Sequence, residues 1–224
     1  MQNEVITYCE KSDKVNIDLD LALRFLRVRQ EPDEETKAML KGCLEEFENA
    51  VSYKASYRFC DIKISGDEVT FNDSFTLKSE KLSKNLSGCD KAVIFTATTS
   101  VAVDRLIRKY MELQLSRAVI IDAIGSSAIE AFCDLLCTHL QDTYNVNFRP
   151  RFSPGYGDLS IKTQPLVLGC CDASRKIGVT LTHNNLMIPS KSVSAIAGIR
   201  PKDEVCEHHS RCENCDKENC LYRE

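Results

Sequence analysis

The stretch RPRFSPGYGD, at residues 149–158, is the most informative part of this sequence. Its two prolines and two glycines exclude an ordinary helix. The Pro154-Gly155 pair predicts a tight turn, because proline presets one backbone dihedral and glycine accepts a positive φ. Glycine also leaves the backbone uncovered, so that a ligand can approach it closely. The stretch therefore predicts an irregular, rigid loop.

Two side chains flank this turn and define the chemistry of the loop. Arg151 carries a planar guanidinium that matches a carboxylate with two hydrogen bonds. Tyr156 adds an apolar ring, a hydroxyl group and a π face that attracts cations. S-adenosylmethionine combines a carboxylate, a sulfonium cation and an aromatic base, so it is compatible with these groups. By themselves, the same residues also fit a structural turn beside a surface arginine.

A second block, IGVTLTHNNLMIPSKSVSA at residues 177–195, follows the loop. Together the two blocks resemble the activation domain of cobalamin-dependent methionine synthase. That family carries an Arg-x-x-Pro-Gly-Tyr loop, then Gly-x-x-Leu-Thr, then Met-x-Pro-x-x-Ser-Val-Ser. The matching residues here are Arg151, Pro154, Gly155, Tyr156, Gly178, Leu181, Thr182, Met187, Pro189, Ser192, Val193 and Ser194. Two ordered blocks at matching separation are much more specific than either block alone.

The resemblance implies that the loop holds S-adenosylmethionine. Arg151 would bind the carboxylate of this ligand, and Tyr156 would lie near its methionine part. The backbone of residues 153–155 would meet its polar groups. Glu130, in the sequence IEAF, stands where the family has a glutamate facing the site, although a solvated glutamate on a helix face is the alternative. The implied ligand-binding residues are Arg151, Ser153, Pro154, Gly155, Tyr156 and Glu130.

The resemblance also implies a role in repair. Cobalamin in methionine synthase is occasionally oxidised to an inactive form, which an electron donor such as flavodoxin or ferredoxin reduces and S-adenosylmethionine methylates. An activation domain binds and positions the methyl donor, while the cofactor carries the hard chemistry. It needs no general base or nucleophile of its own. Because no cobalamin-binding or homocysteine-binding module is evident, the implied partner is a separate cobalamin-binding methionine synthase chain.

The sequence departs from the family pattern at several positions. Tyr156 is followed by Gly157, where the family usually has proline. The segment AIAGIRPKDEV, at residues 195–205, lacks the aromatic residues that help bind the ligand in the family. The N-terminal half resembles the domain only weakly, although Asp18 and Asp20 are available as counterparts of its ligand-binding aspartate.

Hydrophobic spacing around these blocks predicts a mixture of helices and strands. Helices are expected at residues 18–28, 33–51, 101–113, 116–144 and 160–171, and strands at 54–64, 68–71, 92–98, 177–182 and 192–199. No regular βαβ alternation is present, which predicts an α+β fold. We expect one domain over residues 1–200, with mixed helices and an antiparallel or mixed sheet like the activation domain, followed by a cysteine-rich tail at 201–224.

Four of the twelve cysteines crowd into this tail, in the sequence CEHHSRCENCDKENC. A C-x2-C step can place two thiolates on one ion, and four thiolates suit zinc or an iron–sulfur cluster. The predicted metal ligands are Cys206, Cys212, Cys215 and Cys220. A tail of free thiols is the alternative. The other eight cysteines are expected to be buried or partly buried reduced thiols.

Composition limits the class of function. A net charge of −4 does not suggest a nucleic-acid binder, which usually carries a basic face. No apolar run approaches the roughly 20 residues that span a bilayer, and no secretory signal is evident. We therefore expect a cytoplasmic protein that does not associate with a membrane. Two alternatives stay open: a reactivation partner of another corrinoid protein, and an independent metal or iron–sulfur redox enzyme.

Overall fold

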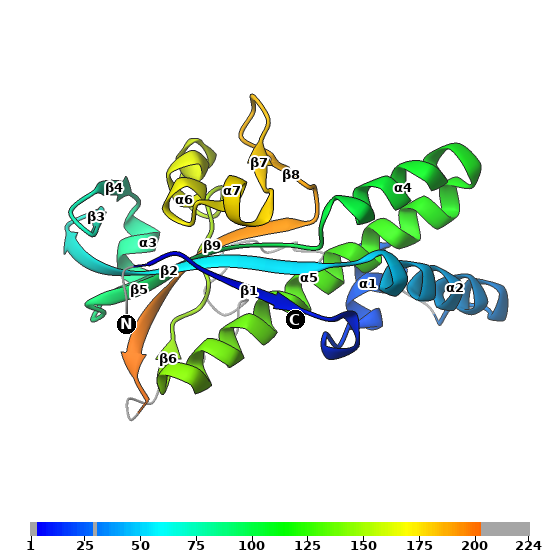
Figure 1. Cartoon of the computed structure of the whole chain (residues 1–224), viewed down its shortest axis with the longest axis horizontal. Helices are drawn as coiled ribbons and strands as arrows, with labels where there is room; N and C mark the ends of the chain where they lie inside the picture. Colours follow the sequence, from blue (N-terminus) through cyan, green and yellow to red (C-terminus); the bar gives the residue numbers. More distant parts are fainter. Residues whose placement is uncertain (1–3, 29–30, 203–224) are drawn as a thin grey trace.

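The computed structural model describes residues 4–28 and 31–202, which form an antiparallel sheet covered by helices on both faces (Figure 1). The helices are α1 (Leu19–Phe25), α2 (Glu34–Ala50), α3 (Glu80–Asn85), α4 (Val101–Leu113), α5 (Leu115–Tyr144), α6 (Gln164–Cys170) and α7 (Ala173–Ile177), with 3-10 turns η1 (Ser12–Lys14) and η2 (Ile161–Thr163). The strands are β1 (Ile6–Glu10), β2 (Tyr53–Ser65), β3 (Glu68–Phe71), β4 (Phe75–Lys78), β5 (Lys91–Thr98), β6 (Val146–Phe148), β7 (Thr180–Leu181), β8 (Met187–Ile188) and β9 (Ser192–Pro201).

The main sheet has the strand order β4-β3-β2-β5-β9-β6, and β1 also pairs with β2. Every strand pair in it is antiparallel. The small β7–β8 pair forms a separate sheet. The prediction of a single α+β domain with an antiparallel sheet is therefore confirmed.

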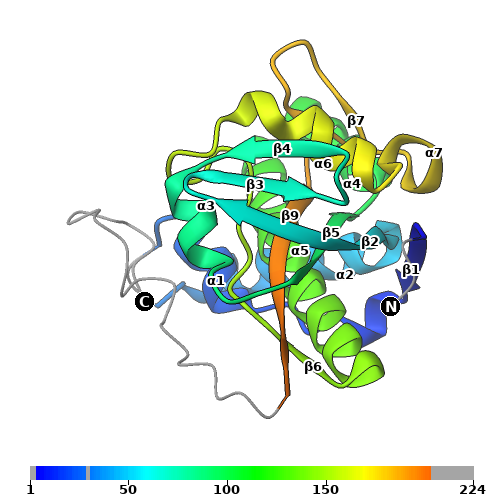
Figure 2. The same ribbon diagram turned by 90° about the vertical axis from the view of Figure 1, so that its left-hand side faces the viewer.

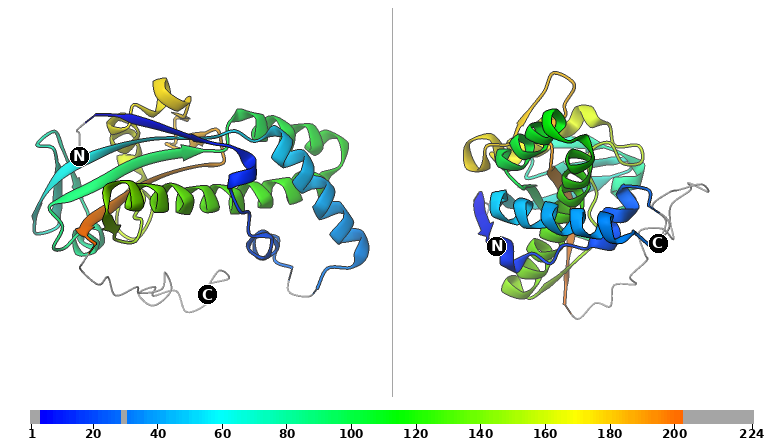
Figure 3. Two further views of the ribbon diagram at one scale, coloured as in Figure 1. Left: turned by 60° about the horizontal axis from the view of Figure 1, so that its bottom comes forward. Right: turned by 90° about the vertical axis from the view of Figure 1, so that its right-hand side faces the viewer.

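The long helix α5 lies along one face of the sheet, as Figure 1 and Figure 3 show. Its apolar side chains share one buried cluster with the strands, and the ring of Phe132 lies 5.0 Å from that of Tyr53 in β2. Burying a side chain of this size stabilises the fold by about 1.5–3 kcal/mol. At one end, α4, α5 and α2 extend beyond the sheet (Figure 1).

Helices α6 and α7 cover the opposite face, and α3 lies beside the β3–β4 hairpin (Figure 2). Successive residues of a strand point to opposite faces. In β2, Phe59 therefore joins the α5 cluster, while Cys60 joins a second cluster with Val167 of α6 and Leu82 of α3. Strand β5 is buried on both faces, which explains its continuous apolar sequence.

Side-chain caps set where several helices begin. The carboxylate of Asp33 accepts a hydrogen bond of 2.8 Å from the Thr36 N–H at the start of α2. Asp18 does the same for Leu21 in α1, at 2.9 Å. These short polar side chains satisfy backbone donors that have no partner inside the helix. They explain why the helices predicted to begin near residues 18 and 33 do begin there.

The strand predicted at residues 177–182 is only partly right. Ile177 ends helix α7, and Gly178 follows with a φ of 74°, so the strand begins only at Thr180. Strands β1 and β4 and helix α3 were not predicted. Within residues 4–28 and 31–202, no helix is both long enough and apolar enough to cross a bilayer.

Candidate functional site

The loop that contains the Pro-Gly pair follows β6 and runs beside β9. The backbone N–H of Arg149 donates to the Gly198 carbonyl at 2.8 Å. Phe152 and Ile196 exchange two backbone hydrogen bonds, of 2.9 and 2.8 Å. Gly198 permits this approach, because a Cβ there would lie only 3.2 Å from Cγ of Arg149. The first half of the loop is therefore fixed to the sheet.

The predicted turn is present at residues 153–156. The N–H of Tyr156 donates to the Ser153 carbonyl at 3.0 Å, and Gly155 has a φ of 92°. Proline in the second position and a positive φ in the third are typical of a type II turn. The N–H of Gly155 donates to the Leu159 carbonyl at 2.8 Å, so this donor is used inside the loop. Pro154 is buried, whereas Gly155 and Tyr156 are exposed.

Asp158 closes the loop onto helix α3. Its carboxylate accepts hydrogen bonds from the Ser79 hydroxyl and, at 2.7 Å, from the Glu80 N–H. The bond from Ser79, together with the N–H groups of the helix, holds the pKa of Asp158 below its ordinary value. The loop is thus anchored on β9 at its beginning and on α3 at its end.

The side chain of Arg151 points to helix α5, on the other face of the sheet from its neighbour Phe152. Its Nη2 lies 2.8 Å from Oε2 of Glu130 and 3.0 Å from Oδ1 of Asp134. These two acids are four residues apart on one helix, so they lie side by side. The structure therefore brings together two predicted site residues, Arg151 and Glu130. Sequence analysis missed Asp134, although its spacing from Glu130 could have indicated it.

One atom of this cluster has an unmet hydrogen-bonding requirement. Nη1 of Arg151 is buried and makes no hydrogen bond within the described part of the chain. Leaving a buried donor unpaired costs about 1–3 kcal/mol, and more for a charged group. An acceptor brought by a ligand would remove this cost. A carboxylate is the kind of acceptor that a guanidinium binds with charge-assisted hydrogen bonds.

The N-terminal segment also approaches this part of α5. The hydroxyl of Ser127, one turn before Glu130, donates to the backbone carbonyl of Asp18 at 2.6 Å. The carboxylate of Asp18 caps α1 and lies 3.7 Å from Nη2 of Arg24. Asp18, named as a possible counterpart of the family aspartate, is thus placed next to the Glu130 turn, with Asp20 exposed in the first turn of α1.

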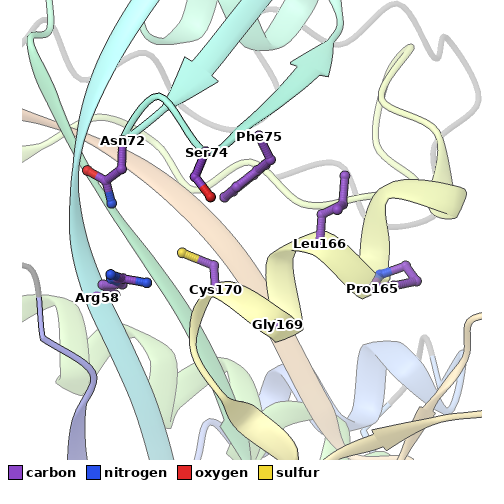
Figure 4. A pocket seen from close by; sticks show the side chains of 8 residues that line it. All are labelled: Arg58, Asn72, Ser74, Phe75, Pro165, Leu166, Gly169 and Cys170. Carbon is purple, nitrogen blue, oxygen red and sulfur yellow. The ribbon is translucent and has the colours of Figure 1, made fainter.

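A surface hollow of about 430 Å³ lies elsewhere, between β2, the β3–β4 turn and α6 (Figure 4). It is on the face of the sheet opposite to α5, so it is separate from the Arg151 cluster. Its lining residues are Arg58, Asn72, Ser74, Phe75, Pro165, Leu166, Gly169 and Cys170. None of them belongs to the predicted ligand-binding set.

Comparison with solved structures shows what this arrangement is similar to. The crystal structure of the MetH reactivation domain bound to AdoHcy matches with a TM-score of 0.70 at 15% sequence identity, covering 91% of this chain and 80% of that chain. The chain has the fold of that reactivation domain. No family model matches the sequence, and no curated protein matches it. The similarity to the reactivation domain was therefore found by comparing three-dimensional structures and not by comparing sequences.

The cysteines divide into a described and an undescribed group. The predicted ligands Cys206, Cys212, Cys215 and Cys220 lie outside the described residues, so the metal site stays a prediction. Within residues 4–28 and 31–202 of this chain, no cluster of three or more His, Cys, Asp or Glu side chains is arranged to hold a metal. The other eight cysteines are free thiols, seven of them buried or partly buried; Cys9 is exposed, contrary to expectation.

Proposed function

We propose that this chain binds S-adenosylmethionine through Arg151 and Glu130 and supports the reductive remethylation of cobalamin on a separate methionine synthase chain. The observation that carries the proposal is the buried Nη1 of Arg151, which has no acceptor in the described structure. The fold match to a domain bound to AdoHcy supports it. AdoHcy and S-adenosylmethionine share their amino-acid and nucleoside groups and differ by the methyl group on sulfur.

The charges of the cluster complement those of the methyl donor. One guanidinium and two carboxylates leave one negative charge in excess. The amino-acid end of S-adenosylmethionine is a zwitterion, and its sulfonium adds one positive charge. In our proposal, Arg151 binds the ligand carboxylate through Nη1, while Glu130 and Asp134 face its ammonium group. Arg151 keeps its contact with the acids through Nη2, so ligand binding does not require the internal ion pair to break.

The loop supplies Arg151 and holds it rigidly, and the proposal keeps the backbone of residues 153–155 and the ring of Tyr156 as further ligand contacts. Its beginning is paired with β9 and its end caps α3, so the turn at residues 153–156 is formed before a ligand arrives. Holding a reactant in one orientation is a large part of the rate gain in group transfer. S-adenosylmethionine supplies the methyl group when bound, and the residues of this chain hold and orient it. The proposal includes a flavodoxin or ferredoxin as electron donor and a cytoplasmic location.

Calorimetric titration of the full chain with S-adenosylmethionine tests the ligand assignment. We expect Arg151→Ala to weaken binding by about 1.5–3 kcal/mol, as is typical of a hydrogen bond to a charged group. Arg149→Ala is the matched control, since the Nη2 of Arg149 donates to the Ser87 carbonyl at 3.3 Å rather than to α5. Equal affinity for the wild type and Arg151→Ala would remove Arg151 from the site.

A pull-down tests the partner separately. The chain is presented with the cobalamin-containing fragment of a methionine synthase, with and without S-adenosylmethionine. Capture that depends on the methyl donor supports the proposed partnership. Capture of another corrinoid protein, with none of the synthase, would reject the partner and keep the ligand assignment. For the tail, anaerobic purification followed by metal and sulfide analysis distinguishes zinc, an iron–sulfur cluster and free thiols.

A further inference from the structure

Two cysteines far apart in the sequence meet beneath the hollow described above. The sulfur of Cys60, in β2, lies 3.7 Å from the sulfur of Cys170, at the end of α6, although 110 positions separate them in the chain. Both are free thiols and nearly inaccessible, with 1% and 8% of their surfaces exposed. The sulfurs are in van der Waals contact, and a disulfide would bring them to the bonding distance of about 2.03–2.05 Å.

Only Cys170 of this pair lines the hollow. Figure 4 shows its sulfur directed toward β2, from which the guanidinium of Arg58 points back toward α6. Asn72 and Ser74 add polar groups to the hollow, and the side chains of Phe75, Pro165 and Leu166 give it an apolar wall. A molecule in the hollow would therefore reach Cys170 first, with Cys60 behind it.

The surroundings act in opposite directions on the pKa values of the two thiols. The two thiols share one S–H···S hydrogen bond, in which either sulfur can be the donor, and the Arg58 guanidinium lies next to Cys170. The hydrogen bond and the guanidinium both lower the pKa of Cys170. The same hydrogen bond, together with burial, raises the pKa of Cys60. The next residue gives an internal comparison. Cys171 is fully buried, and burial raises the pKa of its thiol.

We propose that this hollow is a thiol–disulfide exchange site for a small disulfide that carries carboxylate groups, with Cys170 as the attacking thiolate and Cys60 as the resolving thiol. Cys170 attacks one sulfur of R–S–S–R, forms a mixed disulfide and releases RS⁻, which takes up a proton. Cys60 then loses its proton, attacks the Cys170 sulfur and releases the second RS⁻. Two protein thiols are oxidised by two electrons to one disulfide, and R–S–S–R is reduced to two RSH.

The dimensions and charge of the hollow favour this class of reactant. Its volume of about 430 Å³ lies within the range of small-molecule sites. A disulfide on the surface of another protein would have to project deeply to reach the thiol of Cys170, a residue that is 8% exposed. Arg58 serves twice, since a guanidinium stabilises the thiolate and also binds carboxylates. The exchange site is independent of the Arg151 cluster, which faces α5.

Mass spectrometry of the full, reduced chain tests the proposal, with glutathione disulfide as the probe. After incubation under native conditions, free thiols are alkylated and the chain is digested with trypsin. Cys60 then lies in FCDIK, residues 59–63, and Cys170 in TQPLVLGCCDASR, residues 163–175. We expect these peptides to be joined by a disulfide. Cys171→Ser should keep the link, and Cys170→Ser should abolish it.

Two further variants test the order of the steps. Cys60→Ser should accumulate glutathione on the Cys170 peptide, because the resolving thiol is missing. Arg58→Met should slow the first step several-fold. The proposal is overturned if Cys60 and Cys170 of the wild type stay fully alkylated while the exposed Cys9 acquires glutathione. Such a result would leave the S-adenosylmethionine assignment untouched, because the two thiols and the Arg151 cluster lie on opposite faces of the sheet.

Discussion

The carboxylate of Glu130 lies 2.8 Å from the guanidinium of Arg151 and joins the middle of α5 to the loop that contains the Pro-Gly turn. The Arg151 side chain is only 12% exposed and that of Glu130 30%, so water screens this pair less than an ion pair on the surface. Removing one member of a partly buried pair leaves the other uncompensated. The position of the loop therefore depends on this contact, and so does the proposed affinity for S-adenosylmethionine.

Glu130→Gln should weaken binding of S-adenosylmethionine by about tenfold, or about 1.4 kcal/mol, because a neutral amide neither orients Arg151 as firmly nor attracts the ligand's ammonium. Asp134→Asn is the matched variant. Its side chain is 64% exposed, and exposed pairs contribute about 0–1 kcal/mol. Calorimetric titration compares the two. A larger loss in Asp134→Asn than in Glu130→Gln would assign the principal role to the wrong acid.

The excess negative charge of the cluster predicts a preference between two related ligands. S-adenosylmethionine carries a sulfonium cation that AdoHcy lacks, so the wild-type chain should bind the former more tightly. Glu130→Gln should reduce the preference, because it removes one of the two carboxylates. Titration of both proteins with both ligands measures it. Equal reduction of both affinities by Glu130→Gln would show that Glu130 acts through the shared amino-acid group alone.

Gly198→Ala should destabilise the domain by about 1–3 kcal/mol, as overpacking usually does. A Cβ at this position would lie 2.8 Å from the Cys89 sulfur and 3.2 Å from Cγ of Arg149, which begins the loop. Gly169→Ala in α6 is the control, since nothing lies within 4 Å of a Cβ there. It should be neutral or stabilising, because alanine favours helix by about 1 kcal/mol over glycine. Urea unfolding of both variants measures the difference.

Elements with a strong hydrophobic period could be predicted from the sequence. Helix α4 begins and ends where its amphipathic spacing indicated, at Val101–Leu113. Strand β1 and helix α3 were missed because they are short, with five and six residues, and their patterns are weak. Ile177 was included in a predicted strand at residues 177–182, but it packs in a small cluster with Leu168 and ends α7.

The parts of the candidate site that depend on neighbouring residues in the sequence could be predicted. The Pro-Gly turn follows from two adjacent residues. The resemblance placed Arg151 and Glu130 at one site, but their ion pair was not predicted. The contacts between Asp158 and Ser79, and between Cys60 and Cys170, span 79 and 110 positions. Such contacts exist only once the sheet has brought distant strands and helices together, so a reading of sequence neighbours cannot find them.

Asp158 predicts a specific dependence of stability on pH. Its pKa is lower in the folded chain than the ordinary 3.8, so its carboxylate contributes stability above that pH. The contribution is lost as the pH falls through the lowered pKa and the carboxylate takes up a proton. Asp158→Asn should therefore lower the free energy of unfolding at pH 7 by about 1 kcal/mol, the usual value of a helix cap. In more acidic solution the wild type and the variant should converge.

Asp73→Asn is the matched control, because Asp73 forms an exposed ion pair of 2.7 Å with Lys63 and caps no helix. Its φ of 51° suits asparagine, so its unfolding free energy should stay within about 0.5 kcal/mol of the wild type. Urea unfolding at pH 7 and near pH 3 separates the two positions. If Asp158→Asn stayed less stable by the same amount at both pH values, the charge of Asp158 would not hold the loop on α3, and only the shape of its side chain would matter.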